Sequence, residues 1–187
     1  MKLVVLRHSQ TLMNAQNLIV GRTDDSLSPE GILMAQDAAK KIAAFQSEIP
    51  FSKIYSSPLK RALNTAQIVQ SEIEKSCAKK IDIKIDDRII EQDYGEFEGK
   101  SRLSSEFAFS KSQFAFPTGK TGESHFKLAQ RTYNFLDDMI NKHQNENILV
   151  VTHGGICRVI ATYFNAMTNT EYANWRAQNC QLDFYDI

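Results

Sequence analysis

The sequence has little of several features that would mark a specialised class of protein. It carries no excess of charge, because 22 Lys and Arg residues balance 22 Asp and Glu residues. A chain without net charge lacks the broad basic field that attracts nucleic acids or anionic membranes. No apolar run approaches the ~20 residues of a membrane span, and the run at 3–6 is too short for a signal peptide. We therefore expect neither a nucleic acid nor a membrane as partner.

Cysteine and glycine are also sparse, with 3 and 8 residues. Cys77, Cys157 and Cys180 are odd in number and form no CxxC pair, which favours reduced thiols in a cytoplasmic protein. The glycines form no GxxxxGK[ST], GxGxxG or GxSxG motif. A P-loop, a Rossmann dinucleotide site and a hydrolase nucleophile elbow are therefore not expected.

The 187 residues are enough for one domain with a continuous core, and no linker or repeat divides them. Apolar runs rich in β-branched residues predict strands at 2–7, 53–55, 81–85, 147–152 and 181–185. Helical patterns fill the intervals, which predicts an α/β fold with a mostly parallel sheet covered on both faces. The unbroken apolar run ILVV at 148–151 favours a central strand, and the alternating QLDFYDI that follows residue 180 favours an edge strand.

Start signals and apolar stripes locate the helices. Ser28-Pro29-Glu30 offers an N-cap, a proline at the first helical position and an acid in the first turn, and Ser57-Pro58 repeats the signal. The expected buried stripes are Ile32, Ala35, Ala39 and Ile42 in the first helix, Leu59, Ala62, Leu63, Ala66, Val69 and Ile73 in the second, and Phe126, Ala129, Tyr133, Leu136 and Ile140 in a helix over 123–140. A shorter helix is expected over 155–165.

Reactive side chains follow three of the predicted strands. The strands end in Arg7-His8, in Ser56-Ser57-Pro58 with Arg61 in the helix behind, and in Thr152-His153-Gly154-Gly155. Because the carboxyl ends of parallel strands meet at one edge of a sheet, these groups should converge. Two guanidinium groups, two imidazoles and two helix N-termini suit a dianion, and phosphate is the commonest small one.

The histidines allow two other interpretations. His8 and His153 could hold zinc with Glu91 or Asp93 as a third ligand, but the neighbouring arginines would repel the cation. His125 and His143 have no comparable setting, and we expect them to be structural.

Five segments in order resemble the motifs of the histidine phosphatase superfamily, which is also called phosphoglycerate mutase-like. They are LRHSQTLMNAQNLIVGRTDDSLSPEGILMAQ, SSPLKRALNTA, IIEQDYGEFEG, TGES and VVTHGG, and they span residues 3–155. The resemblance implies a three-layer α/β/α sandwich, and we expect a mostly parallel central sheet with an antiparallel edge strand. Ser9 departs from the family, which usually has glycine there. If that backbone needs a positive φ, serine costs roughly 1 kcal/mol; otherwise its hydroxyl is an extra donor beside the phosphate.

The resemblance also implies roles for individual residues. His8 would be the nucleophile that forms a phosphohistidine, and Glu91 would be the general acid, with Asp93 as a substitute. Arg7, Arg61 and His153 would hold the phosphoryl oxygens, with Asn14 as a neutral donor. Thr11, Gly21, Gly154 and Glu123 match positions that line or support the phosphate pocket. The nearby cations should keep His8 unprotonated, and no metal or cofactor is implied.

The interval between the EG and GES motifs bears on the reaction. Mutases of this family carry a long insertion there, whereas residues 100–121 are few and include Arg102 as their only arginine. We therefore expect little cationic material for a second phosphate and favour a metal-independent phosphatase acting on small phosphorylated metabolites over a phosphoglycerate mutase. A binding module without turnover is the remaining alternative.

The same interval, expected to cap the site within a single domain over 1–187, is rich in phenylalanine. Its rings are Phe107, Phe109, Phe114 and Phe116. They could be buried in the core by a short helix, or they could form an apolar lid that favours aromatic or nucleoside-like substrates, as in an α-ribazole phosphate phosphatase or a broad-range phosphomonoesterase. The physiological substrate and the oligomeric state do not follow from the sequence.

Overall fold

A five-stranded sheet forms the centre of the protein, in a computed structural model that describes residues 1–77 and 80–187. Its strands are β1 (Lys2–Arg7), β2 (Phe51–Ser56), β3 (Asp82–Ile85), β4 (Asn147–Thr152) and β5 (Leu182–Asp186), in the order β3-β2-β4-β1-β5. All neighbouring pairs are parallel except β1 and β5, which are antiparallel. The predicted sheet is therefore confirmed, with β4 at its centre and β5 at its edge.

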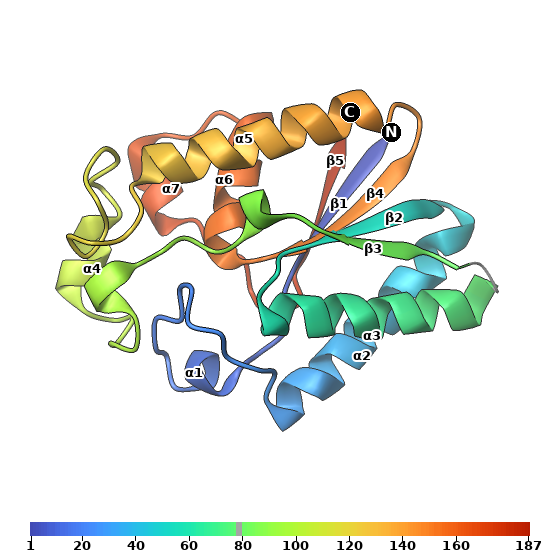
Figure 1. The fold of residues 1–187 in the computed structure, drawn as a ribbon, viewed down its shortest axis with the longest axis horizontal. Helices are drawn as coiled ribbons and strands as arrows, with labels where there is room; N and C mark the ends of the chain where they lie inside the picture. The colour runs from blue at the N-terminus through green and yellow to red at the C-terminus, as the bar shows by residue number, and fades with distance from the viewer. Residues whose placement is uncertain (78–79) are drawn as a thin grey trace.

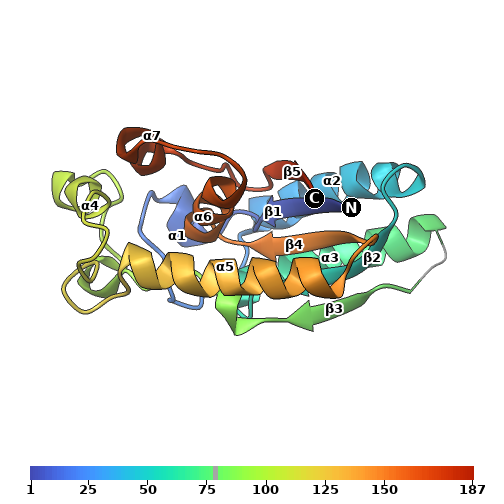
Figure 2. The ribbon, with the colours of Figure 1, turned by 90° about the horizontal axis from the view of Figure 1, so that it is seen from above.

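Helices cover both faces of the sheet and complete a three-layer α/β/α sandwich (Figures 1 and 2). They are α1 (Leu12–Ala15), α2 (Pro29–Ala44), α3 (Lys60–Cys77), α4 (Ser105–Ser110), α5 (His125–Lys142), α6 (Gly154–Phe164) and α7 (Asn169–Asn174). Helices α2 and α3 lie on one face, and α5 and α6 lie on the other.

Alternation along the strands divides the core between these two faces. In β1, Leu3 and Val5 pack into the cluster that holds α5 and α6, while Val4 and Leu6 pack against α2 and α3. Each of these four side chains is buried. Because successive strand residues point to opposite faces, an unbroken apolar run belongs in a strand that is covered on both sides.

Two predicted helix stripes need correction. Ile32 is 43% exposed and Phe126 is 63% exposed, so neither faces the core. In α5 the buried residues include His125, Leu128 and Thr132 instead. The stripe is rotated because this helix buries polar side chains that make their own contacts, such as the Thr132 hydroxyl, which donates to the Leu128 carbonyl over 2.8 Å.

The Ser57-Pro58 start signal is also used differently. Helix α3 begins at Lys60, two residues after the proline. The Ser57 side chain accepts a weak 3.4 Å bond from the Leu59 amide, but its closer partner is a ring nitrogen of His153 at 2.6 Å. By contrast, Ser28 caps α2 as predicted and accepts from the Gly31 amide.

The connections at the carboxyl ends of β1, β2 and β4 build one end of the molecule. Figure 1 places α4, which belongs to the segment 100–121, at this end, away from both termini. None of the helices described is both long and apolar enough to cross a membrane.

Candidate active site

His8 follows β1 directly and is 2% exposed. Its Nδ1 lies 2.6 Å from the carbonyl oxygen of Ser9, which can only accept a hydrogen bond. Nδ1 therefore carries the proton, and Nε2 keeps its lone pair. The Arg61 Nε–H donates to this Nε2 over 3.3 Å. The imidazole thus presents an unprotonated nitrogen next to a cation.

The surroundings keep His8 neutral. Burial is the main cause that holds its pKa well below the usual value, and the charges of Arg61 and Arg7 lower it further. A neutral imidazole retains the lone pair that a nucleophile needs. The predicted effect of the nearby cations is present, although it is smaller than the effect of burial.

Arg61 lies in the first turn of α3 and is 1% exposed. Its Nη1 donates to the carbonyl oxygen of Thr23 over 2.8 Å, and its Nη2 donates to that of Gly21 over 2.6 Å. Gly21 has a φ of +56°, and a Cβ there would come within 2.0 Å of the Glu98 carboxylate. Only glycine fits, so the 21–23 loop that orients Arg61 depends on it.

Arg7 and His153 complete the cationic and imidazole groups around His8. Arg7 donates from Nη1 to the Ala177 carbonyl over 2.6 Å, and its Nε has no hydrogen-bond partner within residues 1–77 and 80–187. The His153 ring centroid lies 5.0 Å from that of His8. Burial, followed by the Arg61 charge, lowers the pKa of His153 well below its usual value. Its Nδ1 is buried and also lacks a hydrogen-bond partner in the part of the chain that the structure describes.

Glu91 is held at the N-terminus of α6. Its Oε2 accepts from the Gly155 amide over 3.2 Å, and its Oε1 accepts from the Gln92 amide over 2.8 Å. A Cβ on Gly155 would lie 2.4 Å from Oε1. The second glycine of the THGG motif therefore makes room for the carboxyl group.

Glu123 supports this arrangement from behind. Its two carboxylate oxygens accept from Nε and Nη2 of Arg131 over 2.8 Å and 2.9 Å. Arg131 Nη2 also donates to the Glu91 carbonyl over 3.2 Å. Asp93, the substitute acid, accepts from the Gly95 amide over 2.8 Å and does not line the pocket.

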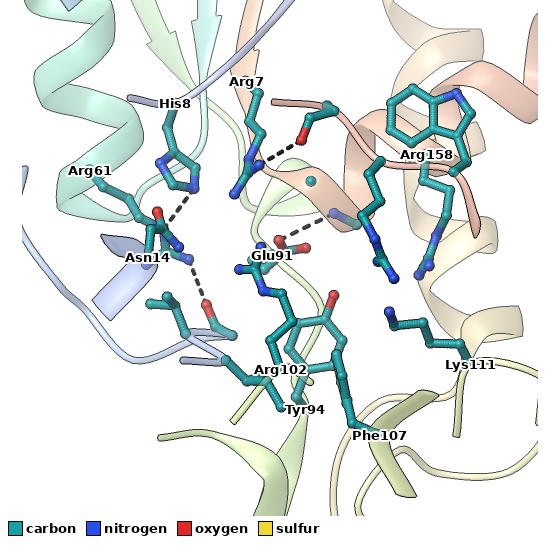
Figure 3. Close-up of a pocket in the computed structure, with 18 residues that line it drawn as sticks. Arg7, His8, Asn14, Arg61, Glu91, Tyr94, Arg102, Phe107, Lys111 and Arg158 are labelled. Carbon is teal, nitrogen blue, oxygen red and sulfur yellow. Dashed lines mark hydrogen bonds between the residues drawn. The ribbon is translucent and has the colours of Figure 1, made fainter. Parts of the chain in front are cut away.

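Thr11 and Asn14 form a capping box on α1. The Thr11 hydroxyl accepts from the Asn14 amide over 3.2 Å. The Asn14 Oδ1 lies within 3.4 Å of the Thr11 nitrogen and 3.5 Å of Asn179 Nδ2, both of which donate to it. The Nδ2 amide is then left to donate, and Asn14 lines the pocket (Figure 3).

These groups surround one pocket. Of the residues predicted for the site, those that line it are Arg7, His8, Asn14, Gly21, Arg61, Glu91 and Gly154. Thr11, Glu123 and His153 lie behind this lining. The prediction that Arg61 and His153 both lie next to His8 is therefore confirmed.

The pocket also contains residues that were not predicted. The polar and charged ones among them are Tyr94, Lys111, Arg158 and Arg176, and Arg102, expected only as a lone arginine, lines the pocket as well. The expectation of little cationic material was therefore wrong. This expectation considered only residues 100–121, whereas α6 contributes Arg158 to the pocket and the segment after α7 contributes Arg176. The spacing of four residues between Gly154 and Arg158 could have revealed one of them, because it puts both on one helix face.

Neither account of the phenylalanines holds for all four rings. Phe107 is buried in the short helix α4 and lines the pocket. Phe109 is 68% exposed and Phe116 is 66% exposed. Phe114 packs instead against His125 and Tyr172, with ring centroids 5.8 Å and 5.7 Å away. One ring, not four, faces the ligand space.

Ser9 does not have a positive φ, so its backbone is unstrained. Its hydroxyl donates to the Gly31 carbonyl over 2.6 Å, and its amide donates to the Thr65 hydroxyl over 3.1 Å. The side chain thus ties β1 to α2 and is fully buried. The expectation of an extra donor beside the phosphate was wrong.

The zinc interpretation finds no third ligand. Within residues 1–77 and 80–187, no three His, Cys, Asp or Glu side chains gather closely enough to hold a metal ion. His8 and His153 instead have Ser9, Arg61 and Ser57 as their partners.

Known proteins are similar to this chain in both sequence and fold. Phosphoglycerate mutase-like protein 4 of Arabidopsis thaliana is 35% identical over 164 residues, which cover 84% of this chain and 68% of that protein. A metal-independent phosphoserine phosphatase of the same organism is 32% identical over 168 residues, covering 85% and 66%.

A solved structure of the phosphoserine phosphatase of Entamoeba histolytica with 3-phosphoglyceric acid superimposes with a TM-score of 0.81. The two sequences are 27% identical, and the match covers 98% of this chain and 89% of the other. The model of the histidine phosphatase superfamily (branch 1) matches residues 3–187. With the pocket around His8, these likenesses lead to one conclusion: the chain belongs to the histidine phosphatase superfamily.

Proposed function

We propose that the protein is a phosphomonoesterase that transfers the phosphoryl group of a small metabolite to His8 and then to water. The observation that carries this proposal is the state of His8. Its Nδ1 is occupied by the Ser9 carbonyl, and its unprotonated Nε2 accepts only the 3.3 Å hydrogen bond from Arg61, which a phosphoryl group would displace. A protein that only bound phosphate would have no need for an unprotonated nitrogen at this position.

The first step forms a phosphohistidine. His8 Nε2 attacks phosphorus, a P–N bond forms, and the ester P–O bond breaks with its electron pair passing to the leaving oxygen. Glu91 gives that oxygen a proton. Arg7, Arg61, Asn14 and His153 stabilise the phosphoryl oxygens, because phosphoryl transfer depends mainly on positioning and charge stabilisation.

The second step releases phosphate. A water molecule gives a proton to the Glu91 carboxylate, and its oxygen attacks phosphorus as the P–N bond breaks. Inorganic phosphate leaves, and His8 regains its lone pair while Glu91 regains the proton it lost. The enzyme returns to its starting state without a metal ion or cofactor.

The names of the relatives support this reaction. They include a metal-independent phosphoserine phosphatase and a putative phosphoserine phosphatase 2 of Hydrogenobacter thermophilus. The free thiols of Cys77, Cys157 and Cys180 fit action in the reducing cytoplasm. A phosphoglycerate mutase is the second candidate, because cations in the pocket beyond Glu91 could hold a second phosphate.

The test is turnover of p-nitrophenyl phosphate in EDTA by the wild type and by His8→Ala. We expect the variant to lose at least about 1000-fold in kcat, as when a covalent nucleophile is removed. His143→Gln is the matched control, because His143 contacts Tyr55 and does not line the pocket. It should retain turnover. It should also retain the acid-labile phosphoenzyme that forms from a radiolabelled phosphate ester and that His8→Ala should lose.

Full turnover in His8→Ala would contradict the proposal. Tight binding of vanadate by a wild type that hydrolyses nothing would identify a binding module. Conversion of 3-phosphoglycerate to 2-phosphoglycerate without release of phosphate would identify a mutase.

A further inference from the structure

Lys111 is a buried amine that the proposed reaction does not use. It follows the last residue of α4 and lines the pocket, yet its side chain is only 5% exposed. Its Nζ lies 4.7 Å from the centroid of the Phe107 ring, which packs edge-on against the Tyr94 ring with centroids 5.3 Å apart. The amine therefore lies against aromatic carbon, where its charged form is costly.

No acid compensates for this burial. Within residues 1–77 and 80–187, no ion pair involves Lys111. The charged and titratable side chains that act on it or respond to it are Arg102 before α4, His125 at the start of α5, Arg158 in α6 and Arg176 after α7. Figure 3 shows the Lys111 amine directed toward the end of the Arg158 side chain. His125 adds no positive charge, because burial is the main cause that lowers its pKa to about 3.

This setting favours the neutral amine. Burial, followed by the charges of Arg176, Arg158 and Arg102, lowers the pKa of Lys111 to about 7. At pH 8 most copies of the protein then carry a lone pair on Nζ, about 200-fold more than for a lysine with the usual pKa. A neutral lysine amine in a desolvated pocket is a nucleophile.

The neighbouring arginines would stabilise an anion formed on this nitrogen. A guanidinium that repels an ammonium group attracts a carboxylate, and its planar fork matches two oxygens. The Arg158 guanidinium is held over the Tyr172 ring, 4.5 Å from its centroid, and its Nε is buried without a hydrogen-bond partner in the described residues. A modification that replaces the positive charge of Lys111 with a negative one therefore turns repulsion into attraction.

We propose that Lys111 is a carbamylation site, at which carbon dioxide reacts with the buried amine. The Nζ lone pair attacks the carbon of CO2, an N–C bond forms, and the electron pair of one C=O π bond passes to oxygen. Nζ then gives a proton to water, which leaves a carbamate anion and a hydronium ion. Carbon dioxide suits this position because it is small and uncharged when it enters, whereas its product carries the negative charge that the arginines lack.

The modification would change the wall of the pocket. A positive charge at Lys111 becomes a negative one, so dissolved CO2 would control the charge that an incoming phosphate ester meets there. The inference does not rest on the proposed phosphatase function, because the carbamate forms without turnover and is detected without a substrate. Failure of either one therefore leaves the other untouched.

Carbon-13 NMR of the protein in buffer equilibrated with carbon-13-labelled CO2 at pH 8 tests the proposal. We expect two carbamate resonances, one from Lys111 and one from the α-amino group of the chain, which belongs to a weakly basic class of amine and serves as an internal reference. Lys111→Met should lose the first resonance and keep the second. Lys111→Arg keeps the positive charge but not the amine, so it should do the same. Lys127→Met, on the exposed side of α5, is the control and should keep both.

Arg158→Met connects the modification to its neighbours. It removes a guanidinium that both favours the neutral amine and would pair with the carbamate, so the Lys111 resonance should weaken at least about threefold relative to the reference. Circular dichroism of each variant confirms that it is folded. Equal Lys111 intensities in the wild type and Arg158→Met would contradict the role of the arginines and overturn the proposal.

Urea denaturation gives a second measurement. Because the carbamate forms on the folded protein, CO2 should move the urea midpoint of the wild type to a higher concentration than it does for Lys111→Met. A folded wild type with the reference resonance alone overturns the proposal, as does a Lys111→Met variant that keeps both resonances. Equal shifts of the midpoint in the two proteins also overturn it.

Discussion

Arg61 Nε and His8 Nε2 lie 3.3 Å apart, although His8 follows β1 and Arg61 lies in the first turn of α3. The contact has two effects on His8. Nε2 accepts the hydrogen bond until a phosphoryl group displaces it, which keeps this nitrogen unprotonated, and the positive charge, after burial, helps to hold the pKa of the imidazole well below its usual value. The arginine is itself fixed by the Gly21 and Thr23 carbonyls.

Arg61→Ala should lower kcat/KM for p-nitrophenyl phosphate by about 100- to 1000-fold, the range found when one stabilising donor is removed. The acid limb of the pH–rate profile should move to higher pH, because His8 loses a neighbouring positive charge. Arg61→Lys keeps the charge but not the planar fork, so its loss should be smaller and its acid limb should stay near that of the wild type. Equal profiles for both variants would refute the electrostatic role.

Gly155→Ala should disturb proton delivery more than phosphate binding. The added Cβ would lie 2.4 Å from Glu91 Oε1, so the carboxyl group must move. We expect a larger fall in kcat for an alkyl phosphate, whose leaving group needs a proton, than for p-nitrophenyl phosphate. In Gly154→Ala the nearest atom to the new Cβ is Arg7 Nε at 3.5 Å, an ordinary contact, and the loss should be smaller. Parallel losses with both substrates would count against Glu91 as the acid.

Ser9→Gly should mainly reduce stability. It removes the hydroxyl that donates to the Gly31 carbonyl over 2.6 Å and adds backbone freedom to the unfolded chain. The combined effect is about 1–2 kcal/mol of unfolding free energy, measurable by urea denaturation. The fall in kcat should be much smaller than in Arg61→Ala. A glycine variant more stable than the wild type would show that serine is strained at this position.

Buried histidines should make folding stability depend on pH. Burial is the main cause that lowers the pKa values of His8 and His153 well below the usual value and that of His125 to about 3. Below about pH 6.5 the unfolded chain binds protons that the folded chain does not. The unfolding free energy should therefore decrease as the pH is lowered below this value, by up to about 1.4 kcal/mol per pH unit for each histidine.

Urea titrations at several values between pH 7.5 and 5 would measure this dependence. His125→Phe should make the slope shallower by one proton, because Phe fits beside the rings of Phe114 and Tyr172 and does not titrate. A flat profile in the wild type would show that these histidines accept protons in the folded state.

Lys111 predicts a pH effect on substrate binding. Its pKa is lowered to about 7, chiefly by burial and then by Arg176, Arg158 and Arg102. The protonated form binds an anion, so KM for 3-phosphoglycerate should rise as pH increases from 7 to 8.5. KM for glycerol 3-phosphate should change less over this range. Lys111→Arg, which stays charged, should flatten the profile; an unchanged profile would exclude Lys111 as the titrating group.

The sequence predicts the sheet and the phosphate end of the pocket for a physical reason. Strands buried on both faces must be continuously apolar, and parallel strands bring their carboxyl ends together, so Arg7, His8 and His153 had to converge. Arg158 gave a weaker signal, because it lies within the mostly apolar helix GGICRVIATYF and only its spacing of four residues from Gly154 puts it on the pocket side. Arg176 follows α7 in the sequence and reaches the pocket only through tertiary packing, so no local sequence pattern marks it.

Helix α6 joins the two ends of the pocket in one rigid rod. In its first turn the Gly155 amide donates a hydrogen bond to the Glu91 carboxyl group, and its second turn contains Arg158. A shift of this helix by a fraction of an ångström would move the support of Glu91 and the Arg158 side of the pocket together. Selection for a new leaving group at Arg158 would then act on the rate of ester cleavage as well, so affinity and turnover cannot evolve independently here.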